Sequence, residues 1–297
     1  MEQIKIGYFA DGPWSHQALE KFLLDSTIGI EFICARHDKP DLTLKEQAEI
    51  HGIDFISHPK INSDEFFQKI SGYNSNLFVS MSFNQIFRKR LIEYPKLKTI
   101  NCHAGKLPFY RGRNILNWAL INDEKEFGIT VHYMDEGIDT GDILMQRLFR
   151  ITDSDNYATL LKRAYSGSAE LLFETVEKLA SGEITSKPQV DMHPLGFYCT
   201  GRVDGDERLQ WNQPSRDIFN FVRAICNPGP EARTFCENIE LKINRVELLS
   251  SAPIYKGIPG AILEVCSNGF YVKTADTYLK VTEWSGIDRV QIGKRLE

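Results

Sequence analysis

Three polar side chains in the middle of the chain have the types that acyl-transfer chemistry requires. Asn101 and His103 stand two residues apart in a segment with strand character, so their side chains point to the same side. Asp139 follows the next expected strand, 128–134, in a loop flanked by glycines. A carboxylate there would hold the tautomer and charge of the imidazole, and the amide N–H would bind a developing oxyanion. We expect a catalytic site without a serine or cysteine nucleophile.

Other interpretations of these residues stay open at this point. His103 could be a loop histidine satisfied by backbone groups, and Asp135 and Asp142 compete with Asp139 for the carboxylate role. The run Asp-Thr-Gly-Asp could be a tight turn with Asx hydrogen bonds. The same run also suggests an aspartic protease, but such a protease needs a second Asp-Thr-Gly motif or a dimer, and it would not explain Asn101 and His103. A metal site is disfavoured because the nearest histidine, His132, belongs to a different strand.

Composition and charge exclude several classes of protein. The chain has 297 residues, which suggests about two domains, and its 42% hydrophobic and 25% charged residues suit a globular core. A formal net charge of −5 argues against a protein whose main task is binding nucleic acid. The chain opens without a signal-peptide pattern and has no apolar run near the roughly 20 residues that cross a bilayer. We expect a cytoplasmic protein with no membrane partner.

The six cysteines are scattered, and none forms a Cys-x-x-Cys pair. This spacing disfavours a zinc site or a disulfide framework and suits a reducing compartment. Cys102 lies between the amide and the imidazole, but on a strand its side chain points to the opposite face, toward the core. We therefore expect no metal and no cysteine nucleophile.

Short apolar runs alternate with helix-like stretches through the first two-thirds of the chain. This alternation indicates βαβ units and predicts an α/β fold with a doubly wound, mostly parallel sheet. Ser15 and Ser63 are expected helix N-caps. The expected strands are 5–10, 29–35, 54–57, 77–81, 99–101, 128–134 and 143–151, and the expected helices are 15–25, 42–51, 63–71, 84–94, 113–121 and 156–181.

The pattern changes near residue 200, where short alternating segments separated by turns predict a smaller, β-rich, OB-like subdomain. We therefore expect a catalytic domain over 1–200 and a subdomain over 201–297. The first strand is not followed by Gly-x-Gly-x-x-Gly, and no Walker A sequence appears, so a nicotinamide dinucleotide is disfavoured. Ligands of open α/β sheets bind beyond the carboxyl ends of the strands, where Asn101 and His103 fall.

Basic residues in two places are candidates for anion contacts. Arg111 and Arg113 in the loop 105–113 could bind phosphate or carboxylate groups bidentately, or could be solvated. Asn227-Pro-Gly-Pro230, which follows Arg223, is either a helix stop or an anion-binding edge.

The chain resembles the N10-formyltetrahydrofolate-dependent formyltransferases. The residues that carry the resemblance are Asn101-x-His103, Leu107-Pro108-x-Tyr110-Arg111-Gly112, and the stretch from Gly128-Ile-Thr-Val-His to Gly-Ile-Asp139-Thr-Gly-Asp142. The stretch 209–232 resembles the branch of this family that acts on nucleotide sugars. The resemblance implies a Rossmann-like formyltransferase core.

The resemblance also implies roles for individual residues. The amine of the substrate would be the nucleophile, with His103 relaying a proton, Asn101 binding the oxyanion and Asp139 orienting His103. Contacts to N10-formyltetrahydrofolate would come from Phe83, Gln85, Ile86, Asp135 and Gly137, and contacts to the acceptor from Tyr110, Arg111, Arg223 and Asn227.

The function expected first is formyl transfer from N10-formyltetrahydrofolate to the amine of a dTDP- or UDP-linked deoxy-amino-sugar. The alternative reactions are formylation of methionyl-tRNA and hydrolysis of formyltetrahydrofolate. The non-enzyme alternative is a folate- or nucleotide-binding module whose active site is no longer functional. If the acceptor is a nucleotide-linked amino sugar, no nucleic acid is expected as a partner. The sugar-modifying relatives suggest a homodimer formed through the C-terminal part.

Overall fold

The computed structural model describes residues 3–287 and 289–297. Within them the chain divides into two compact units. Unit 1 contains the segment that ends at Arg113 together with Phe127–Phe149 and Lys162–Cys199. Unit 2 contains Asn114–Glu126, Arg150–Leu161 and the segment that begins at Thr200. Two segments from the first two-thirds of the chain therefore belong to unit 2, in addition to the C-terminal part.

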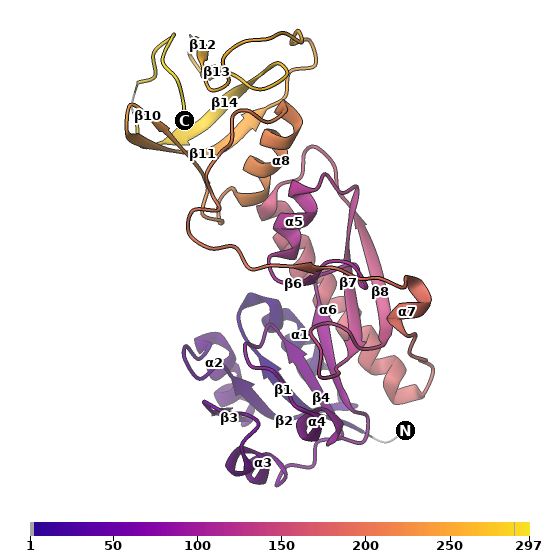
Figure 1. Cartoon of the computed structure of the whole chain (residues 1–297). Helices are drawn as coiled ribbons and strands as arrows, with labels where there is room; N and C mark the ends of the chain where they lie inside the picture. Colours follow the sequence, from indigo (N-terminus) through magenta and orange to yellow (C-terminus); the bar gives the residue numbers. More distant parts are fainter. Residues whose placement is uncertain (1–2, 288) are drawn as a thin grey trace. The chain divides into compact units, whose positions relative to one another are not determined.

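Unit 1 is built on a seven-stranded sheet with strand order β3-β2-β1-β4-β5-β7-β8 (Figure 1). The pairs β1–β2, β2–β3, β1–β4 and β4–β5 are parallel, whereas β7 runs antiparallel to β5. The expected α/β fold with a mostly parallel sheet is confirmed. The strands are β1 (Ile4–Ala10), β2 (Ile28–Ala35), β3 (Asp54–Ser57), β4 (Leu77–Met81), β5 (Thr99–His103), β7 (Glu126–Tyr133) and β8 (Ile143–Arg150).

Five of the six expected helices begin within two residues of the predicted positions. Ser63 caps α3 by accepting a hydrogen bond from the N–H of Phe66, as predicted. Ser15 does not cap α1, because Pro13 begins that helix and the Ser15 hydroxyl donates back to the carbonyl of Gly12. The helices are α1 (Pro13–Leu24), α2 (Leu42–His51), α3 (Asp64–Ile70), α4 (Lys89–Glu93), α6 (Tyr157–Ser181, which begins in unit 2) and α7 (Gln189–Met192).

The expected helix over 84–94 is wrong in its first half, because only α4 is helical there. Residues 82–88 form a loop whose backbone and amide side chains bond outside the segment. Gln85 donates to the carbonyl of His58 at 2.8 Å, and Asn62 accepts from the N–H of Arg88 at 2.9 Å. These tertiary hydrogen bonds replace the local ones that a helix would have made.

An aromatic core lies beneath this loop. The ring of Phe9 on β1 packs edge-on against Phe78 of β4 at 5.3 Å, and against Phe83 and Phe87 of the loop at 5.6 and 4.8 Å. Phe9, Phe78 and Phe87 are almost completely buried. The loop after β4 is thus fixed to the core by its own aromatic residues.

Unit 2 contains a five-stranded sheet of order β10-β11-β14-β13-β12 in which all four neighbouring pairs are antiparallel. The expected C-terminal β subdomain is confirmed. No helix among residues 3–287 and 289–297 is long and apolar enough to cross a membrane. The elements of unit 2 are α5 (Ile115–Ile121), α8 (Ser215–Ile225), β10 (Ala232–Cys236), β11 (Ile239–Glu247), β12 (Ile262–Cys266), β13 (Gly269–Lys273) and β14 (Tyr278–Ser285).

Candidate active site

The antiparallel pairing of β5 with β7 brings a second histidine to the predicted site. Asn101 lies opposite His132, and His103 lies opposite Thr130. The Nδ1–H of His132 donates to the carbonyl of Tyr133 at 2.7 Å, so its Nε2 is free to accept. The amide nitrogen of Asn101 lies 3.2 Å from that Nε2. The amide of Asn101 is therefore oriented by His132, its cross-strand neighbour.

The carboxylate of Asp139 lies between the two imidazoles. Its Oδ1 is 3.6 Å from Nε2 of His132, and its Oδ2 is 3.6 Å from Nδ1 of His103. The main-chain N–H of Gly112 donates to Oδ2 at 2.9 Å. Only 13% of the Asp139 side chain is exposed. The structure thus joins Asn101, His132, Asp139 and His103 into one polar row within unit 1.

The charge of this carboxylate is stabilised by its neighbours. Burial by itself would raise the pKa of Asp139, but the positive charge that His103 carries when protonated and the hydrogen bond from Gly112 both lower this pKa. The balance holds the pKa of Asp139 well below the usual range of an aspartate. Asp139 is therefore an anion at neutral pH.

The second nitrogen of His103 is also engaged. Its Nε2–H donates to the carbonyl of Tyr110 at 2.7 Å. A side chain at Gly105 would collide with the His103 ring and with the Tyr110 carbonyl. Thr130 donates to the carbonyl of Gly105 at 2.7 Å and holds this backbone in place. The orientation of the His103 ring is fixed by the loop that follows β5.

Gln189 on α7 fixes the main chain that carries the carboxylate. Its Nε2 donates to the carbonyls of Asp139 and Gly141, both at 2.8 Å. Its Oε1 accepts from Arg111 at 2.6 Å, so one amide links three separate segments. Asp139 has φ 54, a left-handed conformation that costs energy for a residue with a side chain, and these bonds help to hold it.

The predicted folate residues Asp135 and Gly137 shape the same loop. The carboxylate of Asp135 accepts from the N–H of Gly137 at 3.0 Å and from the hydroxyl of Thr140 at 2.6 Å. A side chain at Gly137 would collide with Thr140. This Asx turn begins at Asp135, ahead of the Asp-Thr-Gly-Asp run for which the sequence left such a turn open, and it leads into Asp139.

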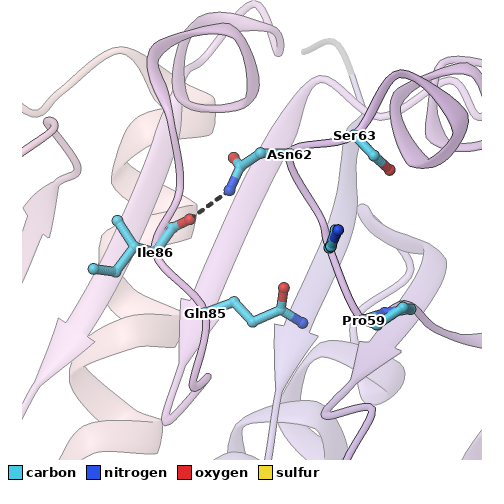
Figure 2. A pocket seen from close by; sticks show the side chains of 6 residues that line it. Pro59, Asn62, Ser63, Gln85 and Ile86 are labelled. Carbon is cyan, nitrogen blue, oxygen red and sulfur yellow. Dashed lines mark hydrogen bonds between the residues drawn. The ribbon is translucent and has the colours of Figure 1, made fainter.

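A pocket of about 480 Å³ lies between the loops that follow β3 and β4 (Figure 2). Figure 2 shows Asn62 donating to the main-chain oxygen of Ile86, a bond of 2.8 Å. Gln85 accepts from the N–H of Ile61 at 3.1 Å, and these two amides tie the loops together. The Ile86 side chain is 56% exposed, whereas Phe83 packs into the aromatic core. The lining residues are Pro59, Lys60, Asn62, Ser63, Gln85 and Ile86.

The predicted acceptor residues fall in both units. Tyr110 is buried and offers its carbonyl to His103, and Arg111 is held by Gln189. Arg223 belongs to unit 2, where its nearly buried guanidinium donates to the carbonyl of Thr152 at 2.8 Å. The N–H of Asn227 donates to the side chain of Asn244 in the same unit. The diphosphate contacts expected of Arg223 and Asn227 stay predictions.

The structure excludes Cys102 as an exposed nucleophile. Its side chain is buried on the far face of β5 and donates to the carbonyl of Ser168. Burial raises the pKa of the Cys102 thiol to about 12. Within residues 3–287 and 289–297, no group of three His, Cys, Asp or Glu side chains could hold a metal ion.

Two residues of this site were not singled out from the sequence. His132 shares a strand face with Thr130, and the alternation of polar residues on β7 was a signal for it. The contact between His132 and Asn101 depends on the antiparallel register of β5 and β7, and this register cannot be predicted from the local sequence of either strand. Gln189 lies 50 residues from Asp139 in a segment with no distinctive pattern, and nothing in the sequence pointed to it.

Known proteins are similar in sequence to segments of both units. A family model described as "Formyl transferase" matches residues 10–176, and one described as "Formyl transferase, C-terminal domain" matches residues 203–291. A methionyl-tRNA formyltransferase from Halalkalibacterium halodurans is 36% identical over 241 residues, which are 81% of this chain and 74% of that one. Another from Geobacillus sp. is 32% identical over 290 residues, which are 94% of this chain and 89% of that one.

Solved structures share the fold. An N-formyltransferase from Helicobacter canadensis, crystallised with folinic acid and dTDP-3-aminofucose, superposes with a TM-score of 0.70. The two sequences are 20% identical, and the match covers 94% of this chain and 99% of the other. At this level of identity the likeness concerns the fold alone.

Replacement of Asp139 by asparagine tests the buried charge. Because the folded-state pKa of Asp139 is lowered below its unfolded value of about 3.9, its stabilising contribution is fully present above about pH 4. It is lost as the pH falls through the folded-state pKa. We expect Asp139→Asn to lower the melting temperature of unit 1 at neutral pH, and the difference from the original protein to shrink steadily below about pH 4.

The measurement is thermal unfolding followed by circular dichroism at several pH values. Asp191→Asn, an exposed aspartate of the same unit, is the matched control and should melt like the original protein at neutral pH. A difference for Asp139→Asn that stays constant down to pH 3, or that is absent at neutral pH, would contradict the assignment.

Proposed function

The chain belongs to the formyl transferase family, and we propose that it transfers a formyl group from N10-formyltetrahydrofolate to a primary amine. The observation that carries the proposal is the row formed by Asn101, His132, Asp139 and His103. It supplies an N–H donor for an oxyanion and a base backed by a carboxylate. The acceptor amine is the nucleophile, which agrees with the burial of Cys102.

The proposed reaction uses the amide and the imidazole in different ways. The amine attacks the formyl carbon, and the carbonyl oxygen becomes an oxyanion that accepts a hydrogen bond from Asn101. One amide N–H of Asn101 is directed to His132, which leaves the other for the substrate. The bond between the formyl carbon and N10 then breaks, the proton lost by the attacking amine passes to N10 by way of His103, and the products are tetrahydrofolate and the N-formylated acceptor.

His103 Nδ1 is the nitrogen that we assign to proton transfer. Nε2 holds its proton in the bond to Tyr110, so Nδ1 carries the lone pair of the neutral ring. The distance of 3.6 Å between Nδ1 of His103 and Oδ2 of Asp139 is longer than a hydrogen bond, so the carboxylate does not occupy Nδ1. A proton taken up at Nδ1 is then stabilised by the adjacent negative charge. Asp139 acts as a positioning and charge-balancing residue.

The pocket beside β3 and β4 is the proposed place for part of the folate. Gln85 and Ile86, which the family resemblance assigned to the folate, line this pocket, and Phe83 supports the loop from below. Asp135 and Gly137 shape the loop on the other side of β5. The exposed side chain of Ile86 supplies an apolar surface for a flat ring system.

Methionyl-tRNA is the first candidate acceptor. The sequence relatives reported above are methionyl-tRNA formyltransferases and align with up to 94% of the chain. This finding reverses the order expected from the sequence, which placed a nucleotide-linked amino sugar first.

A nucleotide-linked amino sugar is the second candidate, and charge favours it. Residues 200–297 contain 13 Lys and Arg and 13 Asp and Glu, so this part of the chain carries no net positive charge. A domain that binds a tRNA backbone is usually basic. The homodimer and the cytoplasmic location stay predictions.

An acceptor panel tests the proposed function. The chain is incubated with N10-formyltetrahydrofolate and, separately, with methionyl-tRNA, a set of UDP- and dTDP-amino-sugars, or no acceptor. Mass spectrometry should find one added formyl group on the methionyl amine. Formylation of a nucleotide sugar alone would replace the first candidate by the second, and release of formate without any formylated amine would overturn the proposal in favour of hydrolysis.

Asn101→Ala tests the oxyanion role. Loss of one oxyanion donor typically lowers kcat about 10²- to 10³-fold, and we expect a decrease of this size with little change in KM for either substrate. Asn74→Ala, an exposed asparagine of the same unit, should keep full activity. A decrease in kcat below about tenfold, in a variant that melts like the original protein, would refute the assignment.

A further inference from the structure

An exposed group of rings lies next to the catalytic loop and takes no part in the chemistry described above. We call Phe109, His193, Phe197 and Tyr198 the aromatic patch. Within unit 1 the ring of Phe109 contacts His193 at 4.9 Å and Phe197 at 5.5 Å. Tyr198 is the next residue after Phe197, and its ring lies against Arg111. Phe197 and Tyr198 are 42% and 53% exposed, which is unusual for large rings at neighbouring positions.

The aromatic patch is attached rigidly to the loop that holds His103. Strand β9 (Tyr198–Cys199) pairs with β6 (Arg111–Gly112), and the N–H of Arg111 donates to the carbonyl of Phe197 at 3.1 Å. The ring of Phe197 packs edge-on against Tyr110, whose carbonyl accepts from His103. The patch is therefore fixed in position relative to the catalytic imidazole.

The aromatic patch and the folate pocket lie on different sides of β5. The pocket is lined by loops that follow β3 and β4, which precede β5 in the strand order. The segment that carries the patch is joined to β8, at the other end of the sheet, by a bridge between Lys187 and Ile143 (Figure 1). Gln189 of the same segment contacts the loop between β7 and β8. A ligand on the patch would thus reach His103 from the side opposite the folate.

We propose that the aromatic patch stacks the nucleobase of the formyl acceptor, with Tyr198 as its main platform. This inference rests on the proposed function and extends it to the acceptor. Arg111 lies over one face of the Tyr198 ring at 5.5 Å, and the ring is still half exposed, so a base can stack from the open side. Base–aromatic stacking tolerates any base because every base has a π-face.

Charge next to the patch suits a nucleotide rather than a plain aromatic ligand. Arg113, which is exposed, follows β6, and its main-chain N–H donates to the carbonyl of Cys199 on β9, so its backbone adjoins the segment that carries Tyr198. A guanidinium binds phosphate oxygens bidentately. Both candidate acceptors carry a base, a pentose (ribose or deoxyribose) and phosphate groups, so the shared chemistry is that of a nucleoside phosphate.

Calorimetric titration of the full chain tests the proposal without any formyl transfer. The probes are adenosine 5′-monophosphate, which represents the terminal nucleotide of a tRNA, uridine and thymidine diphosphates, which represent the sugar carriers, and pyrophosphate, which has no base. We expect at least one nucleotide to bind and pyrophosphate to bind more weakly. Preference for the adenosine or for the pyrimidine nucleotides distinguishes the two sources.

Two variants of one residue separate stacking from folding. Tyr198→Ala should raise the dissociation constant of the nucleotide roughly 5- to 100-fold, the range expected for the loss of one stacked base. Tyr198→Phe should bind the nucleotide as tightly as the original protein does. Leu195→Ala, an exposed apolar residue of the same segment, is the control and should change nothing. In the formylation assay Tyr198→Ala should raise KM for the acceptor and leave KM for the folate unchanged.

Three results would overturn the inference: binding of no nucleotide by the original protein, equal binding by Tyr198→Ala, or a change from dimer to monomer in Tyr198→Ala that leaves nucleotide binding intact. The last result would show that a second copy of the chain covers the patch. Because the titration needs no reaction, a failure here is distinguishable from a failure of the acceptor panel.

Discussion

The candidate site depends on one constraint, a buried carboxylate held between two imidazoles. A buried charge is costly unless its oxygens are paired and hydrogen-bonded. The main-chain N–H of Gly112 donates a hydrogen bond to Asp139 at 2.9 Å. His103 and His132 lie 3.6 Å from its two oxygens, and His103 provides a positive charge beside the carboxylate when it takes up a proton. These neighbours outweigh the cost of burial, since the pKa of Asp139 lies below its usual range.

Several hydrogen bonds in the surrounding structure hold this carboxylate in place. The Asx turn at Asp135 sets the start of the loop, and Gln189 fixes the carbonyls of Asp139 and Gly141. Gln189 also binds Arg111, which adjoins the Gly112 N–H that the carboxylate accepts. The single amide of Gln189 therefore couples α7, the loop after β5 and the loop before β8.

The parts of the fold that depend on local pattern could be predicted from the sequence. Apolar periodicity indicated the sheet of unit 1, and the spacing of Asn101 and His103 indicated a common strand face. The contact between Asn101 and His132 could not be predicted, because it depends on the register between β5 and β7. The loop over 82–88 looked helical for a related reason, since its stability comes from hydrogen bonds to residues that follow β3.

The central claim, that His132 orients Asn101 while Asp139 balances His103, is tested most directly by nitrogen NMR of the protein with ¹⁵N-labelled histidine. This measurement reports which ring nitrogen of each histidine carries the proton. The account predicts a proton on Nδ1 and none on Nε2 for His132, and a proton on Nε2 for His103. A proton on Nε2 of His132 would mean that this nitrogen cannot accept from Asn101, and it would contradict the account.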